Sequence, residues 1–165
     1  MSSFFGHSLA GWTVGLLDKP LSFITTARQK WLWRGWLVMI AIAPDIDYVV
    51  PFLHPRANDG LRITHSFFFA ALLPIITLIY LWGTGTDRTS LRNASIQVIL
   101  ASLSHVGLDL LVGVTALPLF WPIHWPTSKN VFKLPFGILP SAGKPSLSNY
   151  YFHIDRPVLL PTIRQ

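Results

Sequence analysis

Two carboxylates lie in one of the most apolar stretches of this chain, and their chemistry needs an explanation. Asp45 and Asp47 stand in the segment IAPDIDYVV, residues 42–50, which contains no Lys or Arg. A charged side chain inside a membrane-like phase costs about 2.5–3.5 kcal/mol on insertion scales, so such residues pair, face a cavity or bind an ion. A turn at a helix end, with one Asp as a cap, is the simpler explanation. It accounts for one carboxylate better than for two, because neighbouring carboxylates repel each other unless a cation lies between them.

A second pair of polar residues occurs in the apolar segment SHVGLD. His105 and Asp109 are four residues apart, which on a helix places both on one face with their Cβ atoms about 5–6 Å apart. A metal ion bound at about 2.0–2.2 Å from each donor could bridge them. A direct hydrogen bond between the two side chains inside a helical bundle is the alternative.

Two further histidines stand at the edges of apolar segments. His65 lies in RITHS, where Thr64 or Ser66 could cap the following helix, and His7 lies in FGHSLAG. Each of them alone is more often structural than a ligand. Considered with the two pairs above, they complete a set of imidazoles and carboxylates that suits a divalent metal. The candidate metal ligands are His7, Asp45, Asp47, His65, His105 and Asp109.

The composition excludes several other kinds of site and favours a membrane protein. The chain is 51% hydrophobic and 12% charged, whereas a soluble domain is about 25% charged. It has no Cys and its 7 acidic residues are all Asp, which excludes disulfides, thiolate ligands and catalytic Glu. The net charge is +6, but Lys and Arg are scattered among the polar segments instead of forming a stripe, so no nucleic-acid partner is expected. This scatter fits connections beside an anionic lipid surface.

The apolar segments predict an all-α fold, a small membrane-embedded or membrane-associated helical bundle. Helical segments are expected at residues 5–17, 31–53, 65–82 and 94–121, and the second is interrupted by Pro44. The segment 65–82 is the best candidate for a membrane span because it carries no charge after His65. Residues 1–125 are predicted to form the helical domain. Residues 126–165 are predicted to be an irregular, Pro-rich C-terminal extension that re-enters the interface at 158–163.

The motifs, taken in order, resemble those of a known family. Gly-His near the N-terminus, PDID, THS, SHVGLD and LPLFWP resemble the YdjM-like family of bacterial membrane-bound, metal-dependent hydrolases from Gly6 to Pro122. That family is in turn distantly similar to zinc-dependent phospholipase C and P1 nuclease. The family pattern has a His-Arg pair shortly before THS, whereas this chain has Gly60 and Leu61 in that stretch, followed by Arg62.

The resemblance implies the same six residues as metal ligands, with one or more Zn²⁺ ions as cofactor. It implies a location in the bacterial inner (cytoplasmic) membrane, for which a multi-pass or deeply associated arrangement is expected. The expected activity is hydrolysis of a phosphoester by a metal-activated water, with a phospholipid or lipid-linked phosphoester as substrate. Asp45 or Asp47 would bridge metals or act as general base, and Arg62 would stabilise charge on the phosphate. The alternative is a non-enzymatic membrane protein, either a structural bundle with buried His–Asp pairs or an ion or proton pathway.

Overall fold

The computed structural model describes residues 4–17, 19–49, 62–112 and 117–123. These residues form helices and contain no strand, which confirms the all-α prediction. The helices are α1 Phe4–Val14, α2 Ala27–Ile42, α3 Ile46–Val49, α4 Phe67–Gly83 and α5 Arg88–Val112, with single 3₁₀ turns η1 Ala43–Asp45 and η3 Ile63–His65. The predicted extension 126–165, with its segment 158–163, lies outside the described residues, as do Gly60 and Leu61.

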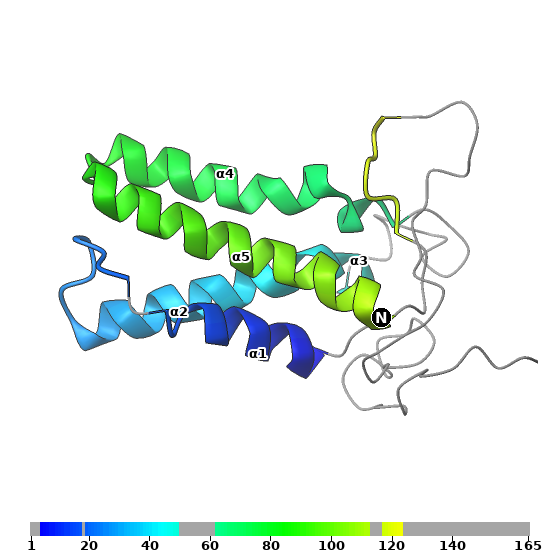
Figure 1. Ribbon diagram of the computed structural model, residues 1–165, viewed down its shortest axis with the longest axis horizontal. Helices are drawn as coiled ribbons and strands as arrows, with labels where there is room; N and C mark the ends of the chain where they lie inside the picture. Colours follow the sequence, from blue (N-terminus) through cyan, green and yellow to red (C-terminus); the bar gives the residue numbers. More distant parts are fainter. Residues whose placement is uncertain (1–3, 18, 50–61, 113–116, 124–165) are drawn as a thin grey trace, which may run out of the picture.

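The four long helices run side by side along the long axis of the molecule (Figure 1). Helix α5 packs against α1, α2 and α4, and α1 packs against α2. The core between α2 and α5 is apolar and includes Leu37, Ile40, Val98 and Ala101. The two 3₁₀ turns and α3 lie together at one end of this bundle (Figure 1).

Two helices begin earlier in the chain than the hydrophobic pattern predicts, because a polar cap precedes each. Thr26 and Gln29 form a capping box at the start of α2, in which the Gln29 N–H donates to Thr26 Oγ1 at 3.2 Å and Gln29 Oε1 accepts from the Thr26 N–H at 3.0 Å. At the start of α5, Asp87 Oδ1 accepts from the Ser90 N–H at 2.9 Å. Both helices therefore extend through polar residues beyond their apolar segments.

The apolar segment 31–53 is divided at Pro44, as predicted. Pro44 has no N–H for the helical ladder and lies in the first turn of η1, directly after α2 ends at Ile42. The chain then turns tightly before α3 begins at Ile46. This turn allows Asp45 and Asp47, which would diverge on a continuous helix, to be buried on the same side of the bundle end.

Residues 65–82, predicted as the best membrane span, include nearly all of helix α4, which is short for a span. Helix α4 has 17 residues and a length of about 25 Å, which is less than the hydrocarbon thickness of about 30 Å. Among the described residues, α5 is the helix long and apolar enough to cross a membrane. The expected multi-pass arrangement is therefore not supported within this part of the chain. Exposed apolar side chains nevertheless cover α4, among them Leu72, Ile75, Ile76 and Ile79, as expected for a membrane-associated bundle.

Gly11 allows α1 to approach α2 closely, and replacing it is expected to destabilise the bundle. A Cβ atom on Gly11 would lie 2.8 Å from the Leu37 carbonyl oxygen and 2.9 Å from Ala41 Cβ, so Gly11→Ala must push the helices apart. We expect a loss of about 1–3 kcal/mol in the free energy of unfolding, measured by thermal unfolding in detergent. Gly35→Ala is the matched control, because its Cβ would meet nothing within 4 Å and Ala favours a helix by about 1 kcal/mol. Equal effects of the two substitutions would contradict the close approach.

Candidate metal centre

The end of the bundle formed by the two 3₁₀ turns gathers all six predicted ligands. His7 comes from α1, Asp45 from η1, Asp47 from α3 and His65 from η3. His105 and Asp109 lie on adjacent turns of α5. Each of the six is at most 4% exposed. Residues far apart in the sequence thus form one buried polar cluster inside an apolar bundle.

One group of four ligands surrounds a common point. His7, Asp45, His105 and Asp109 each offer a ligand atom within 4.8 Å of the other three. His7 Nε2 lies 3.5 Å from Asp45 Oδ2 and 3.5 Å from Asp109 Oδ1. His105 Nε2 lies 3.8 Å from Asp45 Oδ1 and 3.8 Å from Asp109 Oδ2. Donors bound tetrahedrally at about 2.0–2.2 Å from one ion would be about 3.3–3.6 Å apart, and the observed separations of 3.5 and 3.8 Å are close to this range.

A second group shares Asp45 with the first. It consists of Asp45, Asp47 and His65, again with ligand atoms within 4.8 Å of one another. His65 Nε2 lies 3.2 Å from Asp45 Oδ1 and 3.3 Å from Asp109 Oδ2. Asp45 is therefore the residue through which both groups connect.

The ring of His105 is held with its free nitrogen toward the carboxylates. Its Nδ1 lies 2.7 Å from the carbonyl oxygen of Ala41, and because a carbonyl only accepts, Nδ1 must carry the proton. Nε2 then presents a lone pair, and it is buried with no hydrogen-bond partner. Asp45 Oδ2 is buried and likewise makes no hydrogen bond. Native structures rarely leave such atoms unsatisfied, and an ion bound between them would give both atoms a partner.

Arg62 forms an ion pair with the aspartates of the PDID motif. Its Nε donates to Asp47 Oδ2 at 2.8 Å and its Nη2 donates to Asp47 Oδ1 at 2.8 Å, which is a bidentate contact. The same Nη2 donates to Asp45 Oδ1 at 3.1 Å. Asp47 thus faces Arg62 with both oxygens, and its Oδ2 lies 4.0 Å from His65 Nδ1.

The surroundings of the cluster hold its buried carboxylates in the ionised form. Burial would raise the pKa of Asp45, but the facing imidazoles of His105, His65 and His7 hold the pKa of this carboxyl well below its usual range. Burial and the charge of Arg62 act to lower the pKa of His65, whereas hydrogen bonds to Asp109 and Asp45 raise it above its usual value. The carboxylates therefore stay ionised and attract positive charge.

Two contacts that orient the candidate ligands could not be expected from the motifs. Thr64 Oγ1 lies 3.0 Å from His65 Nδ1 and helps to direct Nε2 toward the carboxylates. Of the two candidate helix caps, Ser66 is the one that caps α4, accepting from the Phe69 N–H at 3.2 Å. The Ala41 contact with His105 uses a backbone oxygen, for which the sequence holds no signal.

The comparisons with known proteins agree with the motifs. Searches of curated proteins and of solved structures returned no match. The family model described as YdjM inner membrane protein matches residues 1–154. This match includes every residue of the polar cluster and nearly the whole chain, so the chain belongs to the YdjM inner membrane protein family.

Proposed function

We propose that this chain is a membrane-bound, metal-dependent hydrolase that cleaves a phosphoester with a metal-activated water. The observation that carries the proposal is the unpartnered Nε2 of His105, fixed by the Ala41 carbonyl and directed at Asp45 and Asp109. A histidine oriented in this way by a backbone carbonyl is a common arrangement around a protein-bound metal.

The four residues His7, Asp45, His105 and Asp109 would hold the first ion, and Asp45, Asp47 and His65 would form a second site. Nitrogen and carboxylate donors at this spacing suit Zn²⁺, which is the metal we propose. A bound Zn²⁺ lowers the pKa of water to about 7 and polarises a phosphoryl oxygen.

The protein residues have separate roles in this proposal. Asp45 lies where the two groups meet, so it is the residue best placed to bridge the two ions. General base is the alternative role of Asp45, and Asp47 is less well placed for it because both of its oxygens accept from Arg62. Arg62 compensates the charge of both aspartates, and we further propose that it stabilises negative charge on the phosphate.

The family's membrane location supports a phospholipid or lipid-linked phosphoester as the substrate class. This step, like the distant similarity to zinc-dependent phospholipase C and P1 nuclease, rests on analogy between families.

A non-enzymatic bundle is the competing function, because the His–Asp contacts could also satisfy one another without a metal. A proton or ion pathway is disfavoured, since a pathway needs polar groups along the bundle. In the described residues the buried titratable side chains converge at one end, and α2 and α5 pack through Leu37, Ile40, Val98 and Ala101.

Metal analysis and a hydrolysis assay on the purified protein test the proposal. We expect bound Zn²⁺ and Zn²⁺-dependent phosphodiesterase activity in the wild type. Asp109→Ala should lose the ion of the first site and at least about 100-fold in activity, as expected when a ligand of the metal that activates the water is removed. Asp87→Asn, far from the cluster, is the matched control and should retain both the metal and the activity.

A wild type without metal, or Asp109→Ala with its metal intact, would contradict the proposal. Bound metal without hydrolysis would favour the non-enzymatic function.

A further inference from the structure

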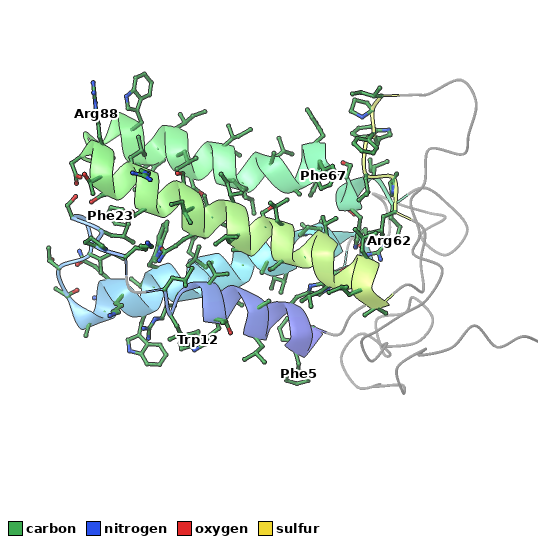
Figure 2. All side chains as sticks on the ribbon, in the orientation of Figure 1. Phe5, Trp12, Phe23, Arg62, Phe67 and Arg88 are labelled. Atoms are coloured by element: carbon green, nitrogen blue, oxygen red, sulfur yellow. The ribbon has the colours of Figure 1, made fainter. Side chains whose placement is uncertain are left out.

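A cavity of about 500 Å³ lies between α2 and α4, away from the metal centre. Its walls are formed by residues of the segment before α2, of α2 and of the second half of α4, including Phe23, Leu32, Trp36, Ile76, Tyr80 and Leu81. Figure 2 shows Phe23 at the end of the bundle opposite to Arg62, so this groove and the polar cluster lie at different ends. The volume is in the range of small-ligand sites.

The groove exists because α2 and α4 are held apart by their packing on α5. Both helices pack against α5. A hydrogen bond joins them directly, from Trp36 Nε1 to Thr77 Oγ1 at 3.1 Å. The indole of Trp36 and the hydroxyl of Thr77 thus form a bridge between the two walls.

Several polar groups in the groove are already engaged within the protein. Thr77 Oγ1 donates to the Leu73 carbonyl at 2.7 Å as well as accepting from Trp36. Trp33 Nε1 donates to Gln97 Oε1 at 2.6 Å, and Gln29 Oε1 accepts from the Thr26 N–H at 3.0 Å. An occupant would therefore find mainly apolar surface, which selects a hydrocarbon over a polar small molecule.

The end of the bundle beside the groove is basic. Arg28 and Lys30 flank Gln29 in the first turn of α2, and Arg88 begins α5 at the same end as Phe23 (Figure 2). All three side chains are exposed. Asp87 is the one described carboxylate outside the metal centre, and it accepts from the Ser22 hydroxyl and the Ser90 N–H. The charge at this end therefore complements an anionic group.

We propose that the groove between α2 and α4 binds one acyl chain of an anionic phospholipid, whose headgroup lies against the basic end of the bundle. The family's inner-membrane location supplies this lipid class as a neighbour. The apolar walls match the chain, and the charge beside them matches the headgroup. This inference does not depend on the metal or on hydrolysis.

Native mass spectrometry of the full-length protein in detergent tests the proposal. Delipidated protein is mixed with dioleoyl phosphatidylglycerol or with the zwitterionic dioleoyl phosphatidylcholine. We expect one phosphatidylglycerol to be retained, with at least a fivefold preference over phosphatidylcholine. Replacing Arg28, Lys30 and Arg88 together with Gln should remove that preference while leaving an apolar groove.

Two substitutions fill the groove from opposite walls. Leu32→Trp on α2 and Ile76→Trp on α4 alter side chains that are 63% and 57% exposed, so either is expected to fold, as checked by circular dichroism. Each should reduce the retained phosphatidylglycerol at least tenfold. Leu103→Trp on α5 is the matched control, 45% exposed and not part of the groove, and it should retain the lipid.

Several results would overturn the proposal. The wild type could retain no phosphatidylglycerol, or both groove variants could retain as much of it as the wild type. An equal loss of retained lipid in Leu103→Trp would also overturn the proposal, because it would indicate lipid bound over the whole apolar exterior. If the full-length protein retained no lipid but a variant lacking residues 126–165 did, the chain's own C-terminal segment would be identified as the occupant instead.

Discussion

Adding Zn²⁺ to the metal-free protein is expected to raise its Tm by about 5–10 °C. An ion at about 100 times its Kd stabilises the folded state by about 2.7 kcal/mol, and each kcal/mol corresponds to about 2–4 °C for a protein of this size. The ligands are already gathered, since His7, Asp45, His105 and Asp109 place donor atoms within 4.8 Å of one another. The measurement is thermal unfolding in detergent, with chelator and then with a graded excess of Zn²⁺.

Asp45→Asn is expected to abolish this rise in Tm. Asp45 belongs to both ligand groups, so its loss affects the whole centre, whereas loss of a ligand from one group would leave the other. Asp87→Asn removes a carboxylate at the far end of α5 and should keep the full increase. If Asp45→Asn were stabilised by Zn²⁺ as much as the wild type, the ion would have to bind elsewhere.

Replacing Arg62 with Met is expected to destabilise the metal-free protein by about 3–5 kcal/mol. This is the typical effect of removing one partner of a buried ion pair, because the remaining charge is left in an apolar environment. Arg62 is 2% exposed and makes a bidentate contact with Asp47 and a further hydrogen bond to Asp45. Denaturant or thermal unfolding in the presence of chelator gives the measurement.

Two further variants test whether the loss of stability comes from breaking the ion pair or from removing any arginine. The double substitution Arg62→Met with Asp47→Leu should recover most of the lost stability, because an apolar pair of similar volume replaces the two charges. Arg92→Met, at a site on α5 away from the cluster, should change the unfolding free energy by less than about 0.5 kcal/mol. A small effect of Arg62→Met would mean that the pair contributes little to the fold.

The candidate site was predictable from the sequence because polar residues are costly in apolar segments. That cost singled out His105, Asp109, Asp45 and Asp47 from their surroundings, and His7 and His65 joined them through their positions at segment edges. All six are buried in one cluster. The helical class followed from the same apolar segments.

The differences between the predicted and observed helices have local physical causes. Helices α2 and α5 start before their apolar segments because Thr26 with Gln29, and Asp87, cap them among polar residues. The predicted span 65–82 matches α4, which ends at Gly83 after 17 residues, while α5 is longer because it also includes the polar residues that follow Asp87. Hydropathy alone does not reveal where a cap extends a helix.

Other features depend on tertiary structure and left no trace in the motifs. The contact between Ala41 and His105 uses a backbone oxygen on α2, and it forms only where α2 meets α5. The bidentate contact of Arg62 with Asp47 likewise depends on the packing of η3 beside η1. A one-dimensional pattern identifies candidate ligands, but the partners that orient them appear only in three dimensions.

The origin of the ligands in separate segments has a consequence for how the protein is made. Synthesis delivers His7 first and Asp109 last, with Asp45 and His65 between them, so an emerging chain cannot close the cluster until α5 has docked. Bringing such distant segments together is the slow part of folding, because the loops between them must be closed first. Capture of the proposed metal would then be a late event in the folding of the bundle, because it needs α5 in place. A chain truncated before Asp109 would lack the stabilisation that the ion provides.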